Sequence, residues 1–177
     1  FTSDKLISSL SQRSSSVSEF IISDKFYSNQ FQIDDFLIQA NFNQAFKASN
    51  YIGYVEGKNN DSVVVISAHY DHLGKVGQTI FPGASDNASG TAMLLSLMKH
   101  YVKYPPKHKT VFMVFAAEEA GILGAQYYVD HPLFPLEKIK FLVNLDILGS
   151  GEDGIQVVNG KIFRKEFEQL VKLNQKK

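Results

Sequence analysis

Two hydrophobic periods alternate along the chain and divide it into predicted strands and helices. Three apolar runs, rich in β-branched or aromatic residues, predict buried strands. Between and after them, apolar residues recur at steps of three and four positions, which predicts helices. The predicted strands are 63–67, 110–117 and 139–146, and the predicted helices are 86–103, 125–129 and a last amphipathic one marked by Phe163, Phe167, Leu170 and Val171.

This order of strand, helix, strand, helix and strand is typical of an α/β sheet with parallel neighbouring strands. Residues 50–57 also alternate and turn through 58–61 into the next strand, which predicts a hairpin. A short fourth strand is predicted over 155–158. The first predicted helix ends before two prolines, and its apolar stripe is predicted to consist of Ala88, Ala92, Leu95, Met98 and Val102.

The first 49 residues are predicted to be a peripheral N-terminal segment. They begin with a serine-rich stretch in which we predict a short helix near 4–11, followed by irregular structure. Packing at the periphery is favoured over a substrate-covering role. No internal repeat or low-complexity linker divides the sequence, so we predict one domain over residues 1–177.

Composition narrows the function classes. The 177 residues are 44% hydrophobic and 12% aromatic, which fits a single globular domain with a sizeable core. Lys plus Arg and Asp plus Glu number 18 each, so no positive excess favours a nucleic-acid partner. No apolar run is long enough for a transmembrane helix. The sequence has no cysteine, so any metal must be held by His, Asp or Glu.

Candidate chemistry begins where the first predicted strand ends, at His69 and Asp71. Side chains two positions apart on an extended chain point to the same side, so the Asp71 carboxylate can lie against the His69 ring. A carboxylate on one ring nitrogen fixes the tautomer and leaves the other nitrogen free to bind a metal. Taken alone, this pair is also compatible with a solvated turn or a structural hydrogen bond.

Further acidic residues follow the other predicted strands. Because ligands bind beyond the carboxyl ends of the strands in open α/β sheets, these side chains are expected to gather near His69. Five carboxylates around one imidazole repel one another unless cations compensate them. Nitrogen and oxygen ligands suit Zn²⁺, and also Mn²⁺ or Co²⁺. The acidic residues are Asp71, Asp86, Glu118, Glu119 and Asp146.

Two of these positions have simpler explanations. Asp86 precedes a predicted helix and can be its N-cap, and the pair Glu118-Glu119 can lie against a helix N-terminus. Adjacent side chains point in different directions, however, so one glutamate can bind a metal while the other addresses an activated water. Two ions about 3.5–4 Å apart can bind a substrate carbonyl and that water together.

Four motifs, in order, resemble those of the M28 family of zinc aminopeptidases. The resemblance covers residues 50–150 and implies a three-layer α/β sandwich with a mostly parallel, mixed central sheet flanked by helices. The motifs are His69-Tyr70-Asp71, Gly83-Ala84-Ser85-Asp86-Asn87-Ala88-Ser89-Gly90, Phe115-Ala116-Ala117-Glu118-Glu119-Ala120-Gly121 and Asn144-Leu145-Asp146.

The resemblance also implies a role for each site residue. His69 and Asp146 would hold one zinc, Glu119 would hold the other, and Asp86 would bridge the two. Glu118 would act as general base and then as general acid, while Asp71 would orient His69. A strained peptide bond, with cis as one option, is implied after Asp86.

One feature departs from the family pattern. Family members place a further histidine on the second zinc, well downstream of the Asp146 motif, whereas no histidine follows His131 here. We interpret the chain as lacking the C-terminal part of the domain; a single-metal or inactive variant is the alternative. His72 is predicted to be a bystander, and structural or exposed positions are predicted for His100, His108 and His131.

The predicted function is therefore metal-dependent hydrolysis of N-terminal peptide bonds, with two Zn²⁺ ions in the complete protein and a peptide or protein as substrate. Two alternatives stay open: a single-zinc enzyme similar to glutaminyl cyclases, and an inactive M28-like binding domain. An extracytoplasmic or secreted location is expected, since the resembled bacterial peptidases are often exported and the chain starts at Phe1. Residue specificity and oligomeric state are not encoded in any recognisable pattern.

Overall fold

The computed structural model describes residues 45–76, 78–151 and 154–175. The helix predicted near 4–11 and most of the predicted N-terminal segment lie outside the described residues. Among the described helices, none combines the length and apolar character needed to cross a membrane.

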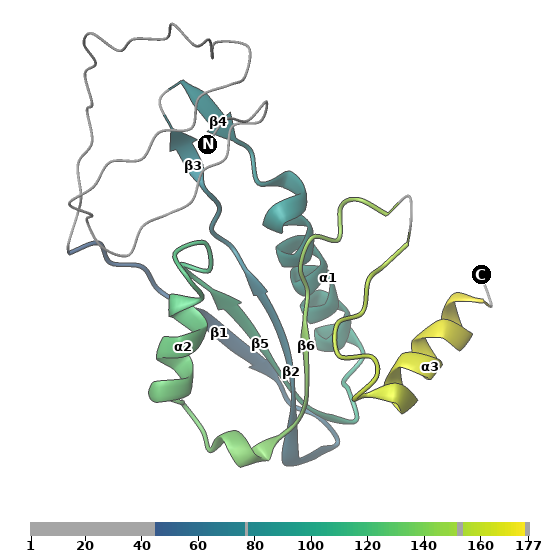
Figure 1. Cartoon of the computed structure of the whole chain (residues 1–177). Coiled ribbons are helices and arrows are strands. Elements are labelled where there is room, and N and C mark those ends of the chain that lie inside the picture. The colour runs from purple at the N-terminus through teal and green to yellow at the C-terminus, as the bar shows by residue number, and fades with distance from the viewer. Residues whose placement is uncertain (1–44, 77, 152–153, 176–177) are drawn as a thin grey trace, which may run out of the picture.

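A four-stranded mixed sheet forms the centre of the fold (Figure 1). Its strand order is β1-β5-β2-β6, so β2 lies between two neighbours. β2 is parallel to both of them, and β1 pairs antiparallel with β5 at the outer edge. A separate two-stranded hairpin, which the sequence analysis missed, pairs β3 with β4. The strands are β1 (Tyr51–Val55), β2 (Asn59–His69), β3 (Gly74–Val76), β4 (Thr79–Phe81), β5 (His108–Phe115) and β6 (Ile139–Asn144).

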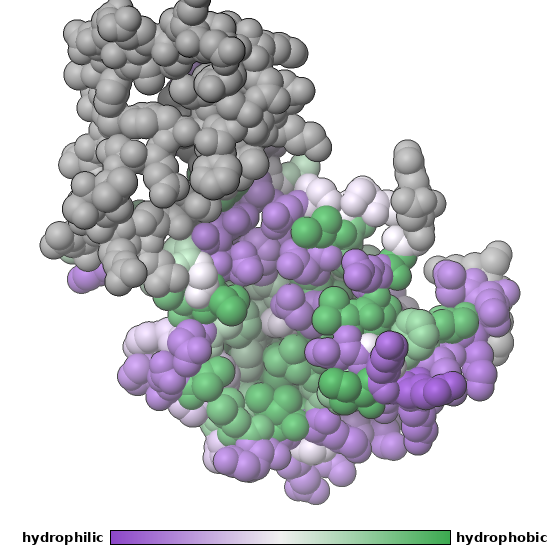
Figure 2. All heavy atoms as spheres, in the orientation of Figure 1, coloured by the Kyte–Doolittle hydropathy of each residue, from purple (hydrophilic) through white to green (hydrophobic). Residues whose placement is uncertain are grey.

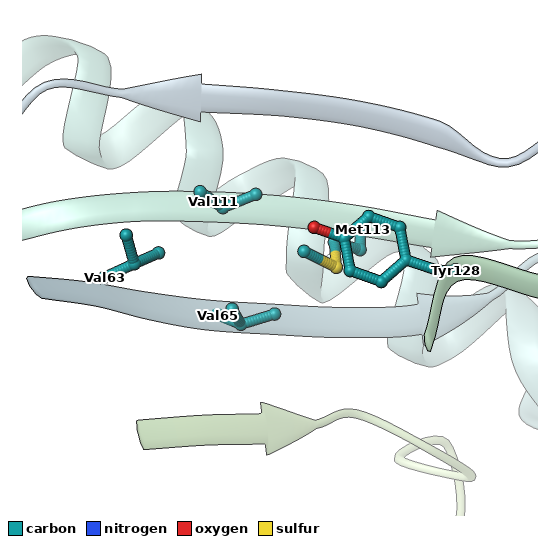
Figure 3. Packing of buried hydrophobic residues seen from close by; sticks show 5 residues of the cluster. All are labelled: Val63, Val65, Val111, Met113 and Tyr128. Atoms are coloured by element: carbon teal, nitrogen blue, oxygen red, sulfur yellow. The ribbon is translucent and has the colours of Figure 1, made fainter. Parts of the chain in front are cut away.

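Helices cover both faces of this sheet, so the predicted three-layer α/β architecture is confirmed. Alternate residues of β2 point to opposite faces, as a strand requires. Val65 packs with Met113 and the ring of Tyr128 from α2 on one face (Figure 3), and Ile66 packs with Leu94 from α1 on the other. The helices are α1 (Gly90–Lys103), α2 (Leu123–Asp130) and α3 (Arg164–Asn174), with two short helical segments, an irregular one over Ala84–Ser89 directly before α1 and one turn over Leu136–Lys138.

The predicted hairpin between the first two strands is wrong. β5 lies between β1 and β2, and the connecting segment crosses the start of β5. There the Lys58 amide donates to the Pro106 carbonyl over 3.1 Å, and the Asn59 amide donates to the Lys107 carbonyl over 2.9 Å. A side chain at Gly57 would overlap the His108 backbone. Local alternation thus identified both strands, but their partners come from a distant part of the chain.

The apolar stripe predicted for the first helix is also largely wrong. Leu94 is completely buried, and Leu97, Met98 and Tyr101 pack beside it. Leu95, by contrast, is 54% exposed. Of the predicted stripe, only Met98 contacts this core. Apolar residues occupy much of the helix circumference, so their spacing alone did not identify the buried face.

Of the two elements predicted after residue 150, the helix is present and the strand is not. The last amphipathic helix is present as α3, and the ring of Phe163 before it meets Phe141 of β6 edge to face. Residues 155–158 form no strand. Ile155 is 78% exposed, and no strand of the described sheets pairs with this segment.

Leu94 provides a test of how α1 is attached to the sheet. We expect Leu94→Ala to lower the free energy of unfolding by about 2–5 kcal/mol, because it leaves a cavity between the helix and the sheet. Urea denaturation measures this difference. Leu95→Ala is the matched control on the same helix and should change stability by about 0.5 kcal/mol or less, as expected for an exposed position. Equal losses in both variants would contradict the observed packing.

Candidate metal centre

Three parallel strands end at the same edge of the sheet, and each is followed by a predicted site residue (Figure 1). β2 ends at His69, the turn after β5 carries Glu118 and Glu119, and Asp146 comes shortly after β6. This edge is where open α/β sheets bind ligands. The pairing of the strands therefore brings together residues that are far apart in the sequence.

Asp86 reaches the same edge from a loop that is anchored by its neighbour Asn87. The Asn87 side chain is 2% exposed. Its amide nitrogen donates to the Leu145 carbonyl over 3.0 Å, and its oxygen accepts from the amides of Gly90 and Ile147. The peptide bond between Asp86 and Asn87 is cis, the option that the family resemblance raised. Sequence reasoning gave Asn87 no role, although it follows Asp86 directly in the motif.

Two hydroxyl groups hold the same loop to the strand ends. Ser89 donates to the Ser85 carbonyl over 2.6 Å and accepts from the Leu148 amide over 2.9 Å. Thr91, in the first turn of α1, donates to the carbonyl of His69 over 2.9 Å. Ser89 rather than Asp86 occupies the N-cap position of α1. The simpler explanation of Asp86 as the cap of that helix is therefore not what the structure contains.

His69 lies at the centre of a first group of possible metal ligands. Its side chain is only 4% exposed, and Nε2 lies 3.2 Å from Asp86 Oδ1 and 3.3 Å from Asp146 Oδ1. On the other side of the ring, Nδ1 lies 3.1 Å from the Asp71 backbone carbonyl oxygen. A proton on Nδ1 donated to this oxygen leaves Nε2 free to bind a cation.

The Asp71 carboxylate lies differently from the predicted arrangement. Its nearest oxygen is 3.8 Å from His69 Nδ1, longer than the distance to the backbone oxygen of the same residue. Instead, the two carboxylate oxygens accept the backbone amides of Glu118 and Glu119 over 3.0 and 3.1 Å. Asp71 thus contacts His69 through its backbone and fixes the glutamate turn with its side chain.

His72, which was predicted to be a bystander, belongs to a second group. Its Nδ1 lies 2.7 Å from Glu119 Oε1 and 3.9 Å from Asp86 Oδ2. The signal that could have found it is its position, since the residues just beyond a strand's carboxyl end line the edge where ligands bind. Gly74, two residues further on, begins β3.

The remaining histidines lie elsewhere, as predicted. The ring of His100 contacts Tyr101 and Tyr104, and His131 stacks on Tyr127. His108 Nδ1 lies 3.2 Å from the Ser62 hydroxyl. None of the three belongs to a possible metal-binding group among the described residues.

The acidic surroundings perturb two titratable groups. Burial raises the pKa of Glu118, and the nearby carboxylates Glu119 and Asp146 raise it further, while His69 opposes them. Burial alone lowers the pKa of His69, but Asp146, Glu118 and Asp86 outweigh this effect, so that its pKa is raised. The raised pKa of His69 thus reflects a negative local potential, which a divalent cation would compensate, whereas burial is the largest cause for Glu118.

The donor atoms of the two groups are chemically suited to zinc. One group is His69, Asp86 and Asp146, and the other is His72, Asp86 and Glu119. Within each group the donor atoms lie within 4.8 Å of one another. Imidazole nitrogen with carboxylate oxygen, and without sulfur, is a usual donor set of catalytic zinc. Asp86 belongs to both groups, as a bridging carboxylate would.

A cavity of about 290 Å³ opens beside the first group. His69, Glu118 and Asp146 line it, together with apolar side chains from β5, α2 and β6 such as Phe115 and Leu142. Figure 2 shows the apolar part of this surface facing the viewer, in the region that α2 and β6 occupy in Figure 1. The side chains of Asp86 and Asp146 are 38% and 40% exposed, so part of the acidic cluster faces solvent.

Comparison with known proteins relates the chain to one family. The model of peptidase family M28 matches residues 50–177. Aminopeptidase YwaD of Bacillus subtilis is 35% identical over 106 residues, which are 58% of this chain and 22% of that protein. A vacuolar membrane protease of Candida glabrata is 32% identical over 126 residues, 68% of this chain and 13% of that protein. The chain thus matches less than a quarter of the length of these two relatives.

Asn87 provides a test of how the site is held. We expect Asn87→Ala to remove the side-chain partner of the Leu145 carbonyl and of the Ile147 amide, and one of the two acceptors of the Gly90 amide, which also donates to the Asn87 backbone carbonyl. Because an unpaired buried group costs about 1–3 kcal/mol, urea denaturation should show a loss of that order. Ser96→Ala, which removes an exposed hydroxyl bonded to the Ala92 carbonyl, is the control and should stay near wild-type stability. A wild-type midpoint for Asn87→Ala would show that these bonds do not hold the loop.

Proposed function

Because the chain belongs to peptidase family M28, we propose that it is a zinc-dependent aminopeptidase that removes N-terminal residues from peptides or proteins. The observation that carries this proposal is the pair of histidine and carboxylate groups that share Asp86. The peptidase class follows from family membership, and the two-zinc mechanism and the preference for N-termini are what we add.

Four residues are proposed as zinc ligands. His69 and Asp146 would hold one ion and Glu119 the other, with Asp86 between them. The short distances from His69 Nε2 to Asp86 and Asp146 support the first assignment. When bound, zinc ions polarise a substrate carbonyl and lower the pKa of water.

Glu118 is proposed as the general base and subsequent general acid. Its carboxylate lies beside the cavity but belongs to neither possible metal-binding group, so it stays free to transfer a proton. Glu118 would accept a proton from the attacking water and pass it to the amine that leaves.

Asp71 is proposed as a positioning residue. Its carboxylate accepts the backbone amides of Glu118 and Glu119, and its carbonyl faces His69 Nδ1. Asp71 thereby fixes the position of the proposed base, Glu118, relative to His69 and Glu119, which are proposed ligands of different ions. Such support from outside the ligand set keeps reacting groups in a fixed geometry.

Recognition of a free N-terminus is proposed to be electrostatic. No lysine or arginine is among the residues that line the described cavity. Two divalent ions leave the five carboxylates with residual negative charge, which favours the ammonium group of a peptide. The name of one relative, aminopeptidase YwaD, supports the same preference.

Glu118→Gln tests the proposed base. We expect the variant to retain bound zinc and to lose at least about 100-fold in kcat, because an amide cannot accept the proton. Turnover of amino-acid 4-nitroanilides gives the rate, and elemental analysis of the dialysed protein gives the zinc content. Near-normal kcat in Glu118→Gln would remove Glu118 from the mechanism.

Three further measurements sharpen this test. Glu137→Gln changes an exposed glutamate on the turn over Leu136–Lys138 and should leave both kcat and zinc content unchanged. Glu119→Gln should lower the zinc content. An acetylated peptide should resist cleavage where the free peptide is cut. Cyclisation of N-terminal glutamine without peptide hydrolysis, or zinc binding without turnover of either substrate, would contradict the proposed aminopeptidase activity.

A further inference from the structure

The turn over residues 116–124 carries the proposed base and closes on itself between β5 and α2. At its ends the Gly124 amide donates to the Ala116 carbonyl over 3.0 Å, and inside it the Ile122 amide donates to the Glu118 carbonyl over 2.8 Å. A side chain at Gly124 would overlap the Ala116 carbonyl oxygen. The two ends of the turn therefore lie in direct contact.

Two residues of this turn adopt a backbone conformation that their side chains disfavour. Ala117 and Ile122 have positive φ angles of 54° and 56°. The left-handed region is unfavourable for residues other than glycine, and a β-branched residue such as Ile122 is an outlier there. Such conformations persist only where the surrounding contacts hold them in place. The turn therefore needs anchors besides its own backbone hydrogen bonds.

Asn50, directly before β1, binds both ends of the turn with one side chain. Its Oδ1 accepts the Ala116 amide over 3.1 Å, and its Nδ2 donates to the Gly124 carbonyl over 2.8 Å. The two bonds use the acceptor and the donor of a single planar amide group. Any apolar side chain at this position would remove both bonds.

The sheet in turn holds Asn50 in place. Tyr51, the next residue, begins β1 and pairs with Val114 of β5. On the other side, the Tyr70 hydroxyl donates to the Ser49 carbonyl over 3.0 Å, and the ring of Tyr70 meets that of Tyr51 edge to face. The side chain that joins the ends of the turn therefore starts from a fixed backbone.

Asp71 anchors the same turn at its centre. Its carboxylate accepts the backbone amides of Glu118 and Glu119. Asn50 and Asp71 together thus bind four backbone groups of the turn from two different strand ends. A displacement of about 1 Å in a reacting group can lower a rate about 100-fold, so the position of the Glu118 carboxylate depends on how firmly both anchors hold.

A purely structural link between β1 and α2 is the simpler explanation of Asn50. That explanation accounts for the two hydrogen bonds and predicts a loss of stability alone when they are removed. It leaves unexplained why the bonded groups enclose the residues with positive φ, Ala117 and Ile122, and the proposed base between them.

We propose that Asn50 is a positioning residue for Glu118. By closing the two ends of the turn, its side chain holds the carboxylate of the proposed base in the geometry that proton transfer requires. Asn50 acts through the backbone and needs no contact with the substrate. The inference rests on the proposed function, since it assigns a support to the proposed base.

Asn50→Ala in the intact protein tests this role through the separate effects on kcat and KM. With zinc in excess, kcat for an amino-acid 4-nitroanilide should fall at least about 10-fold, because the base is misplaced. KM should stay within about twofold, since an interaction needed only in the transition state is lost. Circular dichroism at the assay temperature checks that the variant is folded.

Val63→Ala is the matched control for lost stability. It removes buried apolar atoms near the start of β2, at the opposite edge of the sheet from the turn. Urea denaturation should show both Val63→Ala and Asn50→Ala to be less stable than the wild type, but only Asn50→Ala should lose kcat. An equal loss of kcat in both variants would overturn the inference.

Hydrogen exchange tests the same role without turnover. In the wild type the Ala116 amide should be protected by its bond to Asn50. In Asn50→Ala the amides of Glu118 and Glu119 should exchange at least about 10-fold faster than in the wild type, because the loosened turn opens more often. The Val65 amide, in the centre of β2, should keep its wild-type rate.

A second variant covers the case in which Asn50→Ala does not fold. Asn50→Asp keeps the shape of the side chain and an acceptor for the Ala116 amide, but it has no donor for the Gly124 carbonyl. It should therefore lower kcat and speed the exchange of the Glu118 amide in the same direction as Asn50→Ala.

The outcomes separate this inference from the proposed function. Wild-type kcat in Asn50→Ala, or unchanged exchange of the Glu118 and Glu119 amides, would overturn the inference even if the protein cleaves peptides. An unprotected Ala116 amide in the wild type would overturn it as well. A wild type that cleaves no peptide would refute the proposed function, and the exchange rates would still decide whether Asn50 holds the turn.

Discussion

The parallel pairing of β2 with a strand on either side is the constraint on which the site depends. Because β5 and β6 run in the same direction as β2, the segments after all three strands emerge at one edge of the sheet. The core enforces this arrangement, since both faces of β2 are buried, by α1 on one side and α2 on the other. A slip of one residue would turn Val65 and Ile66 toward the wrong layers. The position of His69 is thus fixed by packing rather than by local turn geometry.

Polar contacts then convert this common edge into a fixed set of donors. Asn87 joins the loop before α1 to the segment after β6, and Asp71 joins the end of β2 to the turn after β5. Both side chains form hydrogen bonds to backbone atoms. They therefore position the neighbouring residues and leave the side-chain atoms of those residues available to a metal ion. Crowding carboxylates together destabilises the fold. These buried hydrogen bonds, and the hydrophobic core beneath them, offset that effect.

The sequence predicted which segments form strands and helices better than it predicted which of these elements lie next to one another. The buried strands, the three helices and the four motifs were identified because periodicity and residue chemistry are local properties. The pairing of β1 with β5 was not identified, since nothing local distinguishes a hairpin from a chain that crosses a third strand. The buried face of α1 was misassigned because Leu94 and Leu95 are equally apolar in sequence. The contacts of Asn87, His72 and Asp71 depend on which groups lie near them in space, and spacing along the sequence does not contain that information.

The electrostatics of His69 explain why such a cluster favours a divalent cation. The carboxylates of Asp146, Glu118 and Asp86 raise the pKa of this ring although burial lowers it. The negative potential that stabilises a proton on Nε2 also attracts a metal cation at that position. The attraction is stronger for a doubly charged ion than for a proton. Since a metal must displace the proton, binding is coupled to its release. Burial, and after it the neighbouring carboxylates, raise the pKa of Glu118, and a cation beside His69 would lower that pKa again. Binding of a cation at His69 and protonation of Glu118 are therefore coupled, because each changes the charge that the other experiences.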